Sequence, residues 1–307
     1  MTRAALCFPG QGSQCAGMAD GLLDEPLARS LLAVADAEGL DLAAALRGSD
    51  EELRPTEIAQ PGLLFVELVL ASVLPTDLDI VGVAGHSVGE YAAVSVAGAY
   101  SAEDAMRLVI RRGREMAAMH EGTMVAVIGL DVDSVTVVCE EVRAGGDVVV
   151  VGNVNAPAQV VVSGSVDGVR RAGELARQAG ARKVIPLNVS GAFHSPLMAP
   201  AAQRFAEVIN ATPRGVLRCP VVCNVDGAAV AGSDALPERL ARQLESPVLW
   251  IDCVRTLVAL GAEVLVELGP GAVLSGLARR IDPTAATATV NDRDGAARLA
   301  TSPATPA

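Results

Sequence analysis

One stretch of the sequence, residues 80–97, combines the patterns of a buried strand, a tight turn and a helix. The apolar run Ile80–Ala84 is followed by GHSVG at 85–89, and an apolar helix pattern continues to Ala97. A G-x-S-x-G sequence between a strand and a helix is typical of a nucleophile elbow, a sharp turn that lifts the serine hydroxyl above the edge of a sheet. The pattern predicts an α/β fold with Ser87 as nucleophile; the alternative is a plain glycine-rich turn.

The composition favours helices packed on a parallel sheet. Hydrophobic residues make up 51% of the 307 residues and aromatic residues only 2%, so the core must consist of alanine, valine and leucine. This length allows one large domain or two smaller ones. The formal net charge of −12 provides no basic field for phosphates, so we expect no nucleic-acid partner.

No segment has the pattern of a signal peptide or a membrane span. The apolar run at residues 4–8 is too short, and Glu67 and Glu90 interrupt the longer ones. We therefore expect a cytoplasmic protein without membrane contact. Cys219 and Cys223 have no histidine or second cysteine pair nearby, so we expect no metal site and reduced thiols.

The hydrophobic pattern changes at about residue 123 and changes back near residue 190. The order β-α-β-β-α-β predicted for residues 123–189 is typical of a ferredoxin-like unit. Because α/β patterns lie on both sides, this unit should be a small subdomain inserted into a large α/β domain, formed by residues 1–122 and 190–285. Residues 286–307 are rich in alanine, threonine, proline and aspartate, which predicts a loosely ordered tail.

Two helix patterns flank the elbow in the sequence. One covers residues 61–74, where Pro61 suits the first helical position and Gln60 would cap the helix. The other covers residues 102–119 and begins after Ser101, a residue that favours helix starts.

Arg112 lies within the second of these helices. Arginines on a helix are usually solvated, but apolar residues and Gly113 flank Arg112, which suggests an inward-facing side chain. A semi-buried guanidinium needs an anionic partner, and a substrate carboxylate held by two parallel hydrogen bonds would serve. The spacing alone leaves the alternative of a solvated arginine open.

A nucleophilic serine needs a base, and the chain has 3 histidines. The side chain of His86, adjacent to Ser87 on a sharp turn, should point away from the hydroxyl and could instead fix the elbow. His120 lies at a polar helix end. His194 lies in a loop bounded by glycine and proline, where a base can be held over an elbow. His194 is therefore the candidate base; the alternative is a loop histidine with a structural hydrogen bond.

The sequence PGQGSQ at 9–14 follows a short strand pattern. A dinucleotide fingerprint does not fit, because the third glycine is misplaced and no acidic residue follows a second strand at the required distance. We interpret the segment as a strand-to-helix loop at the same sheet edge as Ser87. It would offer a donor from Gln11 or its backbone to a developing oxyanion.

Taken together, the motifs resemble those of malonyl-CoA:acyl-carrier-protein transacylases, in the same order, over about residues 4–282. They are FPGQGSQ at 8–14, TEIAQP at 56–61, GHSVGEY at 85–91, RGREM at 112–116, NVNAPAQVVVSG at 153–164, GAFHSPLM at 191–198, SPVLW at 246–250 and ELGPGAVL at 267–274.

The resemblance implies a fold and a reaction. The fold would be an α/β-hydrolase-like large domain, with a parallel central sheet, that carries an inserted ferredoxin-like subdomain. In a ping-pong mechanism, Ser87 would accept the malonyl group of malonyl-CoA and pass it to the phosphopantetheine thiol of an acyl carrier protein, with His194 as general base and acid. No cofactor would be bound permanently, and we expect a monomer.

The resemblance also implies roles for other residues. The backbone N–H groups of Gln11 and Val88 would form the oxyanion hole, and the main-chain carbonyl of Gln243 would orient His194. Arg112 would bind the free carboxylate of the malonyl group. The other substrate-binding positions would be Gln60, Met116, Phe193 and Asn155.

Substrate choice and pathway are less constrained. Phe193 would leave little room for a methyl branch and so favour malonyl over methylmalonyl, although one methyl is worth only about 1–3 kcal/mol. The same active site would serve fatty-acid synthesis, a polyketide synthase loaded in trans, or a malonate decarboxylase. A serine thioesterase or hydrolase is the alternative from another class, but it would have no use for a buried Arg112.

Carrier proteins are typically acidic, so an acidic enzyme would need a local basic face to dock one. The small subdomain and the last helix offer candidate residues, although ordinary solvated charges are an equal alternative. These residues are Arg170, Arg171, Arg177, Arg182 and Lys183, with Arg279 and Arg280 opposite.

Overall fold

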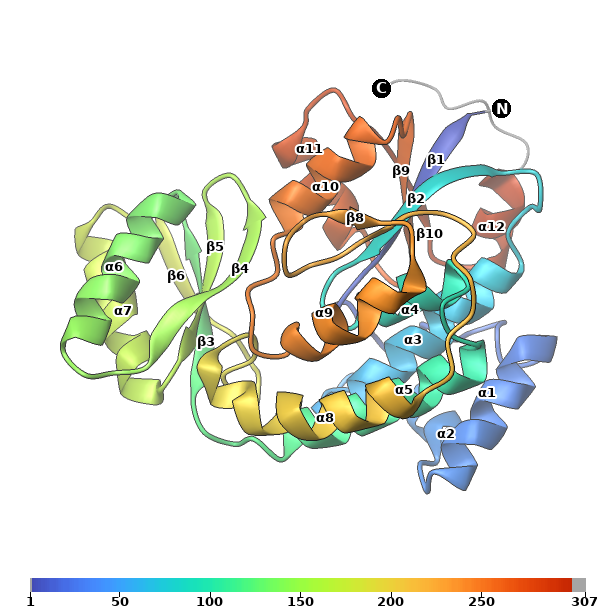
Figure 1. The fold of residues 1–307 in the computed structure, drawn as a ribbon, viewed down its shortest axis with the longest axis horizontal. Coiled ribbons are helices and arrows are strands. Elements are labelled where there is room, and N and C mark those ends of the chain that lie inside the picture. The colour runs from blue at the N-terminus through green and yellow to red at the C-terminus, as the bar shows by residue number, and fades with distance from the viewer. Residues whose placement is uncertain (1, 300–307) are drawn as a thin grey trace.

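The computed structural model describes residues 2–299, which form two sheets surrounded by helices (Figure 1). The expected α/β class is confirmed. Within this range, no helix combines the length and apolar character that crossing a bilayer requires. The larger sheet has the strand order β10 (Ala286–Val290), β9 (Val264–Leu268), β1 (Arg3–Phe8), β2 (Asp79–Gly85), β7 (Val221–Val222) and β8 (Ala229–Val230).

The larger sheet is parallel except for β8, which runs antiparallel to β7. Alternate residues of its central strand β1 enter different cores: Leu6 and Phe8 pack on one side of the sheet and Cys7 on the other. This alternation is expected for a strand covered on both faces. One face is covered by α3 (Thr56–Ser72), α4 (Gly89–Val96) and α5 (Ala102–Ala117), the other by α10 (Trp250–Ala259) and α11 (Val273–Ile281).

The smaller sheet is antiparallel and is formed by one continuous segment of the chain. Its strand order is β4 (Val149–Ala156), β5 (Gln159–Gly164), β3 (Thr123–Ile128) and β6 (Lys183–Pro186). Valines of β3, such as Val125 and Val127, pack beneath α6 (Val132–Ala144) and α7 (Val166–Gln178). The intervening Met124 and Ala126 belong instead to the core of the larger part. The two faces of β3 therefore join both parts of the molecule.

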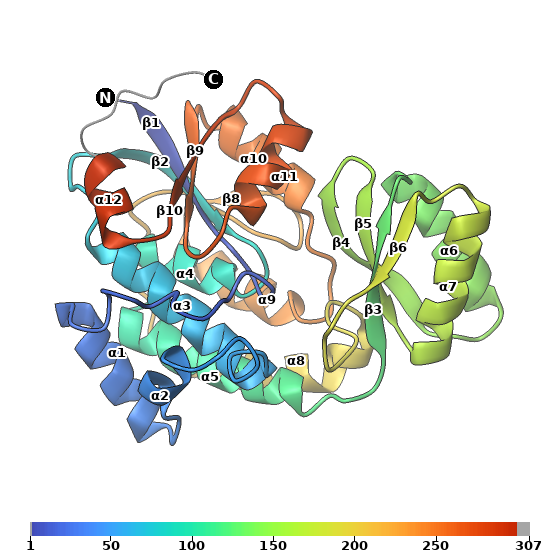
Figure 2. The ribbon, with the colours of Figure 1, turned by 180° about the vertical axis from the view of Figure 1, so that it is seen from behind.

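The two parts lie side by side in Figures 1 and 2, and backbone hydrogen bonds connect them. The N–H of Val154 in β4 donates to the carbonyl of Val248 over 2.9 Å, and the N–H of Val248 donates to the carbonyl of Gly152 over 2.9 Å. In addition, the Ser163 hydroxyl in β5 donates to the carbonyl of Phe193 over 2.6 Å.

The remaining helices are α1 (Pro26–Ala37), α2 (Leu42–Leu46), α8 (Ala199–Ala211), α9 (Leu236–Arg242) and α12 (Arg293–Leu299), with 3₁₀ turns at Pro196–Met198 and Ser233–Ala235.

The prediction of a loosely ordered tail from residue 286 is wrong for residues 286–299. Strand β10 pairs in parallel with β9 from Ala286 to Val290, and α12 follows it. Val290 is only 1% exposed because it enters the main core. Composition failed here because strand pairing along the free edge of β9 stabilises a segment that would not fold alone. Residues 300–307 of the predicted tail lie outside the described residues.

The predicted start of the helix at Pro61 is also wrong. Helix α3 begins at Thr56, so Pro61 lies inside it and Gln60 is an interior residue rather than a cap. A proline there removes one hydrogen bond, to the carbonyl four residues earlier. That carbonyl belongs to Glu57, an exposed residue that water can reach. The earlier start allows the side chain of Gln60 to face the site described next.

Candidate active site

The elbow between β2 and α4 has the geometry expected of a strained turn. Ser87 has a φ of 53°, in the left-handed region that residues with a Cβ rarely adopt. Both flanking glycines are required for steric reasons. A Cβ on Gly85 would collide with the backbone of Gly89, and one on Gly89 with the carbonyl of Phe8 in β1. The crossing of these backbones therefore sets the position of Ser87 at the sheet edge.

Ser87, His194 and the main chain of Gln243 form a hydrogen-bonded chain. The distance from Ser87 Oγ to His194 Nε2 is 2.8 Å, and that from His194 Nδ1 to the Gln243 carbonyl oxygen is 2.8 Å. Because a carbonyl only accepts, Nδ1 carries the proton and Nε2 accepts from the Ser87 hydroxyl. Burial, followed by the charge of Arg112, lowers the pKa of His194 to about 3. The imidazole is therefore neutral at pH 7, as a base must be.

Gln11 and Val88 lie where donors to an oxyanion would be needed. Strands β1 and β2 are paired with Phe8 opposite Gly85, so the loop carrying Gln11 and the elbow leave the same sheet edge. Within residues 2–299, neither the Gln11 N–H nor the Val88 N–H donates to another group of the protein. The side chain of Gln11 has a different partner: its Nε2 donates to the Thr56 hydroxyl over 3.1 Å.

Arg112 is fully buried in α5 and directed at the nucleophile. Its Nη1 donates to Gln60 Oε1 over 2.7 Å, and its Nη2 donates to Ser87 Oγ over 3.1 Å and to Gln243 Oε1 over 3.0 Å. The guanidinium carbon also lies 5.3 Å from the centre of the Tyr91 ring. A guanidinium has five N–H groups, and the buried Nε–H has no partner among residues 2–299. The solvated-arginine alternative is therefore excluded.

A cavity of about 360 Å³ opens above Ser87 and His194. Its lining includes the predicted positions Gln11, Gln60, Met116, Asn155 and Phe193, whereas Val88, Arg112 and Gln243 lie behind the lining. Met124, Asn155 and Val161 contribute a wall from the smaller sheet, so both parts of the molecule enclose the cavity.

His86 also lines this cavity, but it does not contact the Ser87 hydroxyl. Its Nε2 lies 2.8 Å from Asn155 Oδ1, and its ring lies 5.5 Å from that of Trp250. The side chain thus points away from the nucleophile, as predicted, and links the elbow to β4. His120 is exposed.

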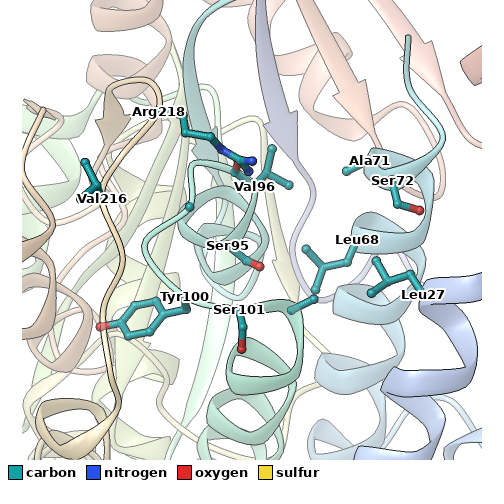
Figure 3. A pocket seen from close by; sticks show the side chains of 12 residues that line it. Leu27, Leu68, Ala71, Ser72, Ser95, Val96, Tyr100, Ser101, Val216 and Arg218 are labelled. Carbon is teal, nitrogen blue, oxygen red and sulfur yellow. The ribbon is translucent and has the colours of Figure 1, made fainter. Parts of the chain in front are cut away.

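A second cavity, of about 500 Å³, lies at the other end of α4 (Figure 3). Ser95, Val96 and Tyr100 line it, and Arg218 donates to the carbonyl of Val96 at its rim. No histidine or carboxylate stands beside a serine in this lining. It therefore lacks the groups for nucleophilic catalysis.

Sequence reasoning missed two buried polar residues beneath the elbow, Asn224 and Glu90. Asn224 accepts a hydrogen bond from the N–H of Ser87, and Glu90 accepts one from the side chain of Gln243. A signal was present for each: Asn224 is a polar residue directly after a strand pattern, and Glu90 is an acidic residue within an apolar helix pattern.

The chain resembles known proteins in both sequence and fold. Residues 6–292 match the family described as "Acyl transferase domain". The chain is 42% identical to the malonyl CoA-acyl carrier protein transacylase of Escherichia coli strain K12 over 95% of this chain and 97% of the relative. It is 39% identical to the protein of the same name from Bacillus subtilis strain 168, over 95% and 94% of the two chains.

A solved structure of a malonyl-transacylase in complex with its type II PKS acyl-carrier protein has a TM-score of 0.90 to this chain. The two are 38% identical in sequence, and the match covers 96% of this chain and 98% of the other. The chain therefore belongs to the acyl transferase domain family.

Proposed function

We propose that the chain transfers a malonyl group from malonyl-CoA to the phosphopantetheine thiol of an acyl carrier protein, through a malonyl-Ser87 intermediate. The observation that carries the proposal is the buried Arg112, whose Nη2 lies 3.1 Å from Ser87 Oγ. A cation so close to the nucleophile suits an acyl group with a second, negative end. The names and extents of the relatives described above support the same substrate and acceptor.

In the first half-reaction, Ser87 Oγ attacks the thioester carbonyl carbon while His194 Nε2 takes the hydroxyl proton. Negative charge develops on the carbonyl oxygen, which the N–H groups of Gln11 and Val88 would receive. When the tetrahedral intermediate collapses, the carbon–sulfur bond breaks and the proton on His194 passes to the departing coenzyme A sulfur. The products are malonyl-Ser87 and free coenzyme A.

In the second half-reaction the steps run in reverse with a new thiol. His194 takes the proton of the phosphopantetheine thiol, whose sulfur attacks the ester carbonyl of malonyl-Ser87. The Ser87 oxygen leaves and regains its proton from His194. Serine and histidine supply nucleophile and base throughout, so the proposal requires no resident cofactor.

Arg112 would hold the free carboxylate of the malonyl group during both half-reactions. Its two Nη atoms donate three hydrogen bonds to neutral acceptors of the protein. The Nε–H is buried and has no acceptor among the described residues. A carboxylate satisfies such donors with short, charge-assisted hydrogen bonds. Gln60, Met116, Phe193 and Asn155 line the space that the rest of the substrate would fill.

The acceptor would dock on a basic edge at one end of the smaller sheet. Ile128 of β3 is paired with Gln159 on one side and with Lys183 on the other, and Arg280 of α11 donates to Gln159. Strand spacing places Lys183 about 10 Å from Gln159, so these cations form one row. Arg182 and Arg279 are the sequence neighbours of Lys183 and Arg280. In the described part of the chain, Arg182, Lys183 and Arg279 form no ion pair with an acidic residue.

Two other predicted docking residues are less suitable. Arg170 contacts Asp167 and Glu174, and Arg171 contacts Asp147, so both charges are already balanced on α7. Arg177, also predicted, lies on the same helix α7, and neither the strand pairing nor the bond from Arg280 places it at this edge. The proposed docking surface is therefore Arg182, Lys183, Arg279 and Arg280.

We also infer an α/β-hydrolase-like large domain, residues 2–122 and 190–299, with a ferredoxin-like insertion at 123–189. The elbow at the carboxyl end of the parallel strand β2 supports the first assignment. The order β3-α6-β4-β5-α7-β6 supports the second.

Mass spectrometry of the intact protein tests the proposed intermediate. After incubation with malonyl-CoA, the wild type should carry one malonyl group, located on Ser87 by peptide mapping, and holo-acyl carrier protein should remove it. Ser87→Ala should remain unmodified. A malonyl group that persists on the variant, or one that water removes as fast as the carrier does, would falsify the proposal.

A further inference from the structure

The nucleophile rests on a buried hydrogen-bond network that does not line the substrate cavity. Resting on the function proposed above, we propose that Asn224 is a positioning residue: its side-chain amide holds the backbone of Ser87, and Glu90 and the Gln243 side chain hold Asn224. Asn224 is fully buried and Glu90 nearly so. Their influence on the reaction would therefore pass through Ser87.

Strand register brings Asn224 to the elbow. Strand β7 pairs in parallel with β2, with Val221 opposite Val83 and Val222 opposite Ala84. Continued by two residues, this register places Asn224 beside the residues that follow β2. The carbonyl of Asn224 accepts from the N–H of Leu249 over 2.9 Å, which anchors its own backbone. The position is thus set by the sheet rather than by a mobile loop.

The side-chain amide of Asn224 contacts the backbone of both Gly85 and Ser87. Its Oδ1 accepts from the N–H of Ser87 over 2.8 Å, and its Nδ2 donates to the carbonyl of Gly85 over 2.7 Å. The left-handed conformation of Ser87 costs on the order of 1–3 kcal/mol and persists only where neighbouring groups enforce it. Two short bonds from one amide hold the two peptide groups that precede the Cα of the strained residue.

Glu90, in the first turn of α4, holds the backbone of Asn224 and the side chain of Gln243. Its Oε2 accepts from the backbone N–H of Asn224 over 3.2 Å and from Nε2 of Gln243. Burial raises the pKa of Glu90 to about 7, against the opposing effects of these two hydrogen bonds and the charge of Arg112. Without Glu90, the buried N–H of Asn224 would lose its acceptor and Gln243 Nε2 would lose one of its acceptors, which is costly in a buried site.

The Gln243 side chain acts on the next peptide group. Its Nε2 donates to the carbonyl of Ser87 over 2.9 Å. Because a peptide is planar, holding the Ser87 carbonyl also fixes the direction of the Val88 N–H at the other end of the same plane. Asn224 and Gln243 therefore control both peptides that flank the nucleophile, one for the hydroxyl and the other for the proposed oxyanion donor.

Asn224→Asp tests this inference with little change in side-chain shape. An ionised aspartate keeps an acceptor for the Ser87 N–H but cannot donate to the Gly85 carbonyl. We expect kcat for malonyl transfer to fall by roughly 10²-fold, since small misplacements of reacting groups have effects of that size. KM for malonyl-CoA should change little, because Asn224, Glu90 and Gln243 are not among the residues that line the cavity.

Thr256→Val is a matched control for a purely structural effect. The Thr256 hydroxyl donates to the carbonyl of Gly227 over 2.6 Å and so stabilises the loop after Asn224 without touching the elbow. Its loss should lower the melting temperature and leave kcat unchanged. Asn224→Ala, which introduces no charge, provides the same comparison if the aspartate variant does not fold.

The outcomes separate this inference from the proposed function. Wild-type protein that fails to form malonyl-Ser87 would overturn the proposed function itself. Wild-type protein that forms it, together with an Asn224 variant of normal kcat, would overturn the positioning role alone. A fall in kcat that Thr256→Val reproduces at equal loss of stability would overturn it as well.

Discussion

At the scale of single residues, a buried cation distinguishes this site from that of a general serine hydrolase. Among the described residues, the hydrogen-bond acceptors of Arg112 are all neutral, and its Nη2 lies within hydrogen-bond distance of Ser87 Oγ. The cation–π contact with Tyr91 stabilises the charge, while burial lowers the pKa of the guanidinium. The carboxyl group of Glu90 interacts with this charge but forms no hydrogen bond to Arg112 in the described part of the chain. A neutral acyl chain would leave the guanidinium without an anion in direct contact, whereas a malonyl carboxylate would provide one.

Arg112→Ala should therefore change acyl-group selectivity. We expect malonyl transfer to fall about 10²-fold, the effect of losing a hydrogen bond to a charged group, and acetyl transfer to fall much less. Rates of acyl-enzyme formation from malonyl-CoA and acetyl-CoA give the comparison. Arg111→Ala is the control, because Arg111 is exposed and paired with Glu115 on the same helix. Equal losses for both acyl groups would argue against carboxylate binding.

The same variant should alter the pH dependence of acylation. The charge of Arg112 is the second cause, after burial, of the lowered pKa of His194. Removing that charge should raise the pKa of His194 toward its ordinary value. Because only neutral imidazole acts as a base, the acid limb of the pH–rate profile should move to higher pH in Arg112→Ala. An acid limb at the wild-type pH would show that the charge has no such effect.

At the scale of secondary-structure elements, the sequence predicted what depends on neighbouring residues. The elbow was predictable because the strand, turn and helix patterns adjoin Ser87, and His194 because few histidines compete with it. Features that depend on distant partners were not predictable. The interior position of Pro61 depends on a helix start at Thr56, and Asn224 reaches Ser87 only through the pairing of β2 with β7.

Strand β10 provides a test of an element that composition had assigned to a tail. Val290 enters the core, whereas the neighbouring Thr289 is exposed on the same strand. Val290→Asp would bury an unpaired charge and should destabilise the protein by about 3 kcal/mol or more. Thr289→Asp should change stability by only about 0.5 kcal/mol. Urea unfolding of both variants provides the comparison, and similar values for the two would contradict the sheet pairing.

At the scale of the whole molecule, the cavity above Ser87 lies where the two sheets meet. The larger part contributes Ser87 and His194, while Met124, Asn155 and Val161 come from the smaller sheet. The bridge between Asn153 and Val248 and the contact between His86 and Asn155 hold the two parts together at the cavity. An acceptor that reaches Ser87 therefore enters a cavity that both parts enclose.

The charge distribution indicates where an acidic carrier would approach that cavity. The chain has a net charge of −12, so a protein of like charge is repelled overall and needs a local attraction. Arg182, Lys183 and Arg279 offer cations without acidic partners in the described part of the chain, whereas Arg170 is already paired with Asp167 and Glu174. The docking surface should therefore respond to charge reversal at 182 and 183 and tolerate it at 170.

The double variant Arg182→Glu/Lys183→Glu should raise KM for the carrier protein about tenfold, the effect of losing roughly 1.4 kcal/mol of attraction. The rate of malonyl-Ser87 formation from malonyl-CoA should stay unchanged, because neither residue lines the cavity. The difference between wild type and variant should shrink as ionic strength rises and screens the charges. Arg170→Glu is the matched control on the same part of the molecule. If Arg170→Glu raises KM for the carrier protein as much as the double variant does, the carrier docks on α7 rather than on the edge of the smaller sheet.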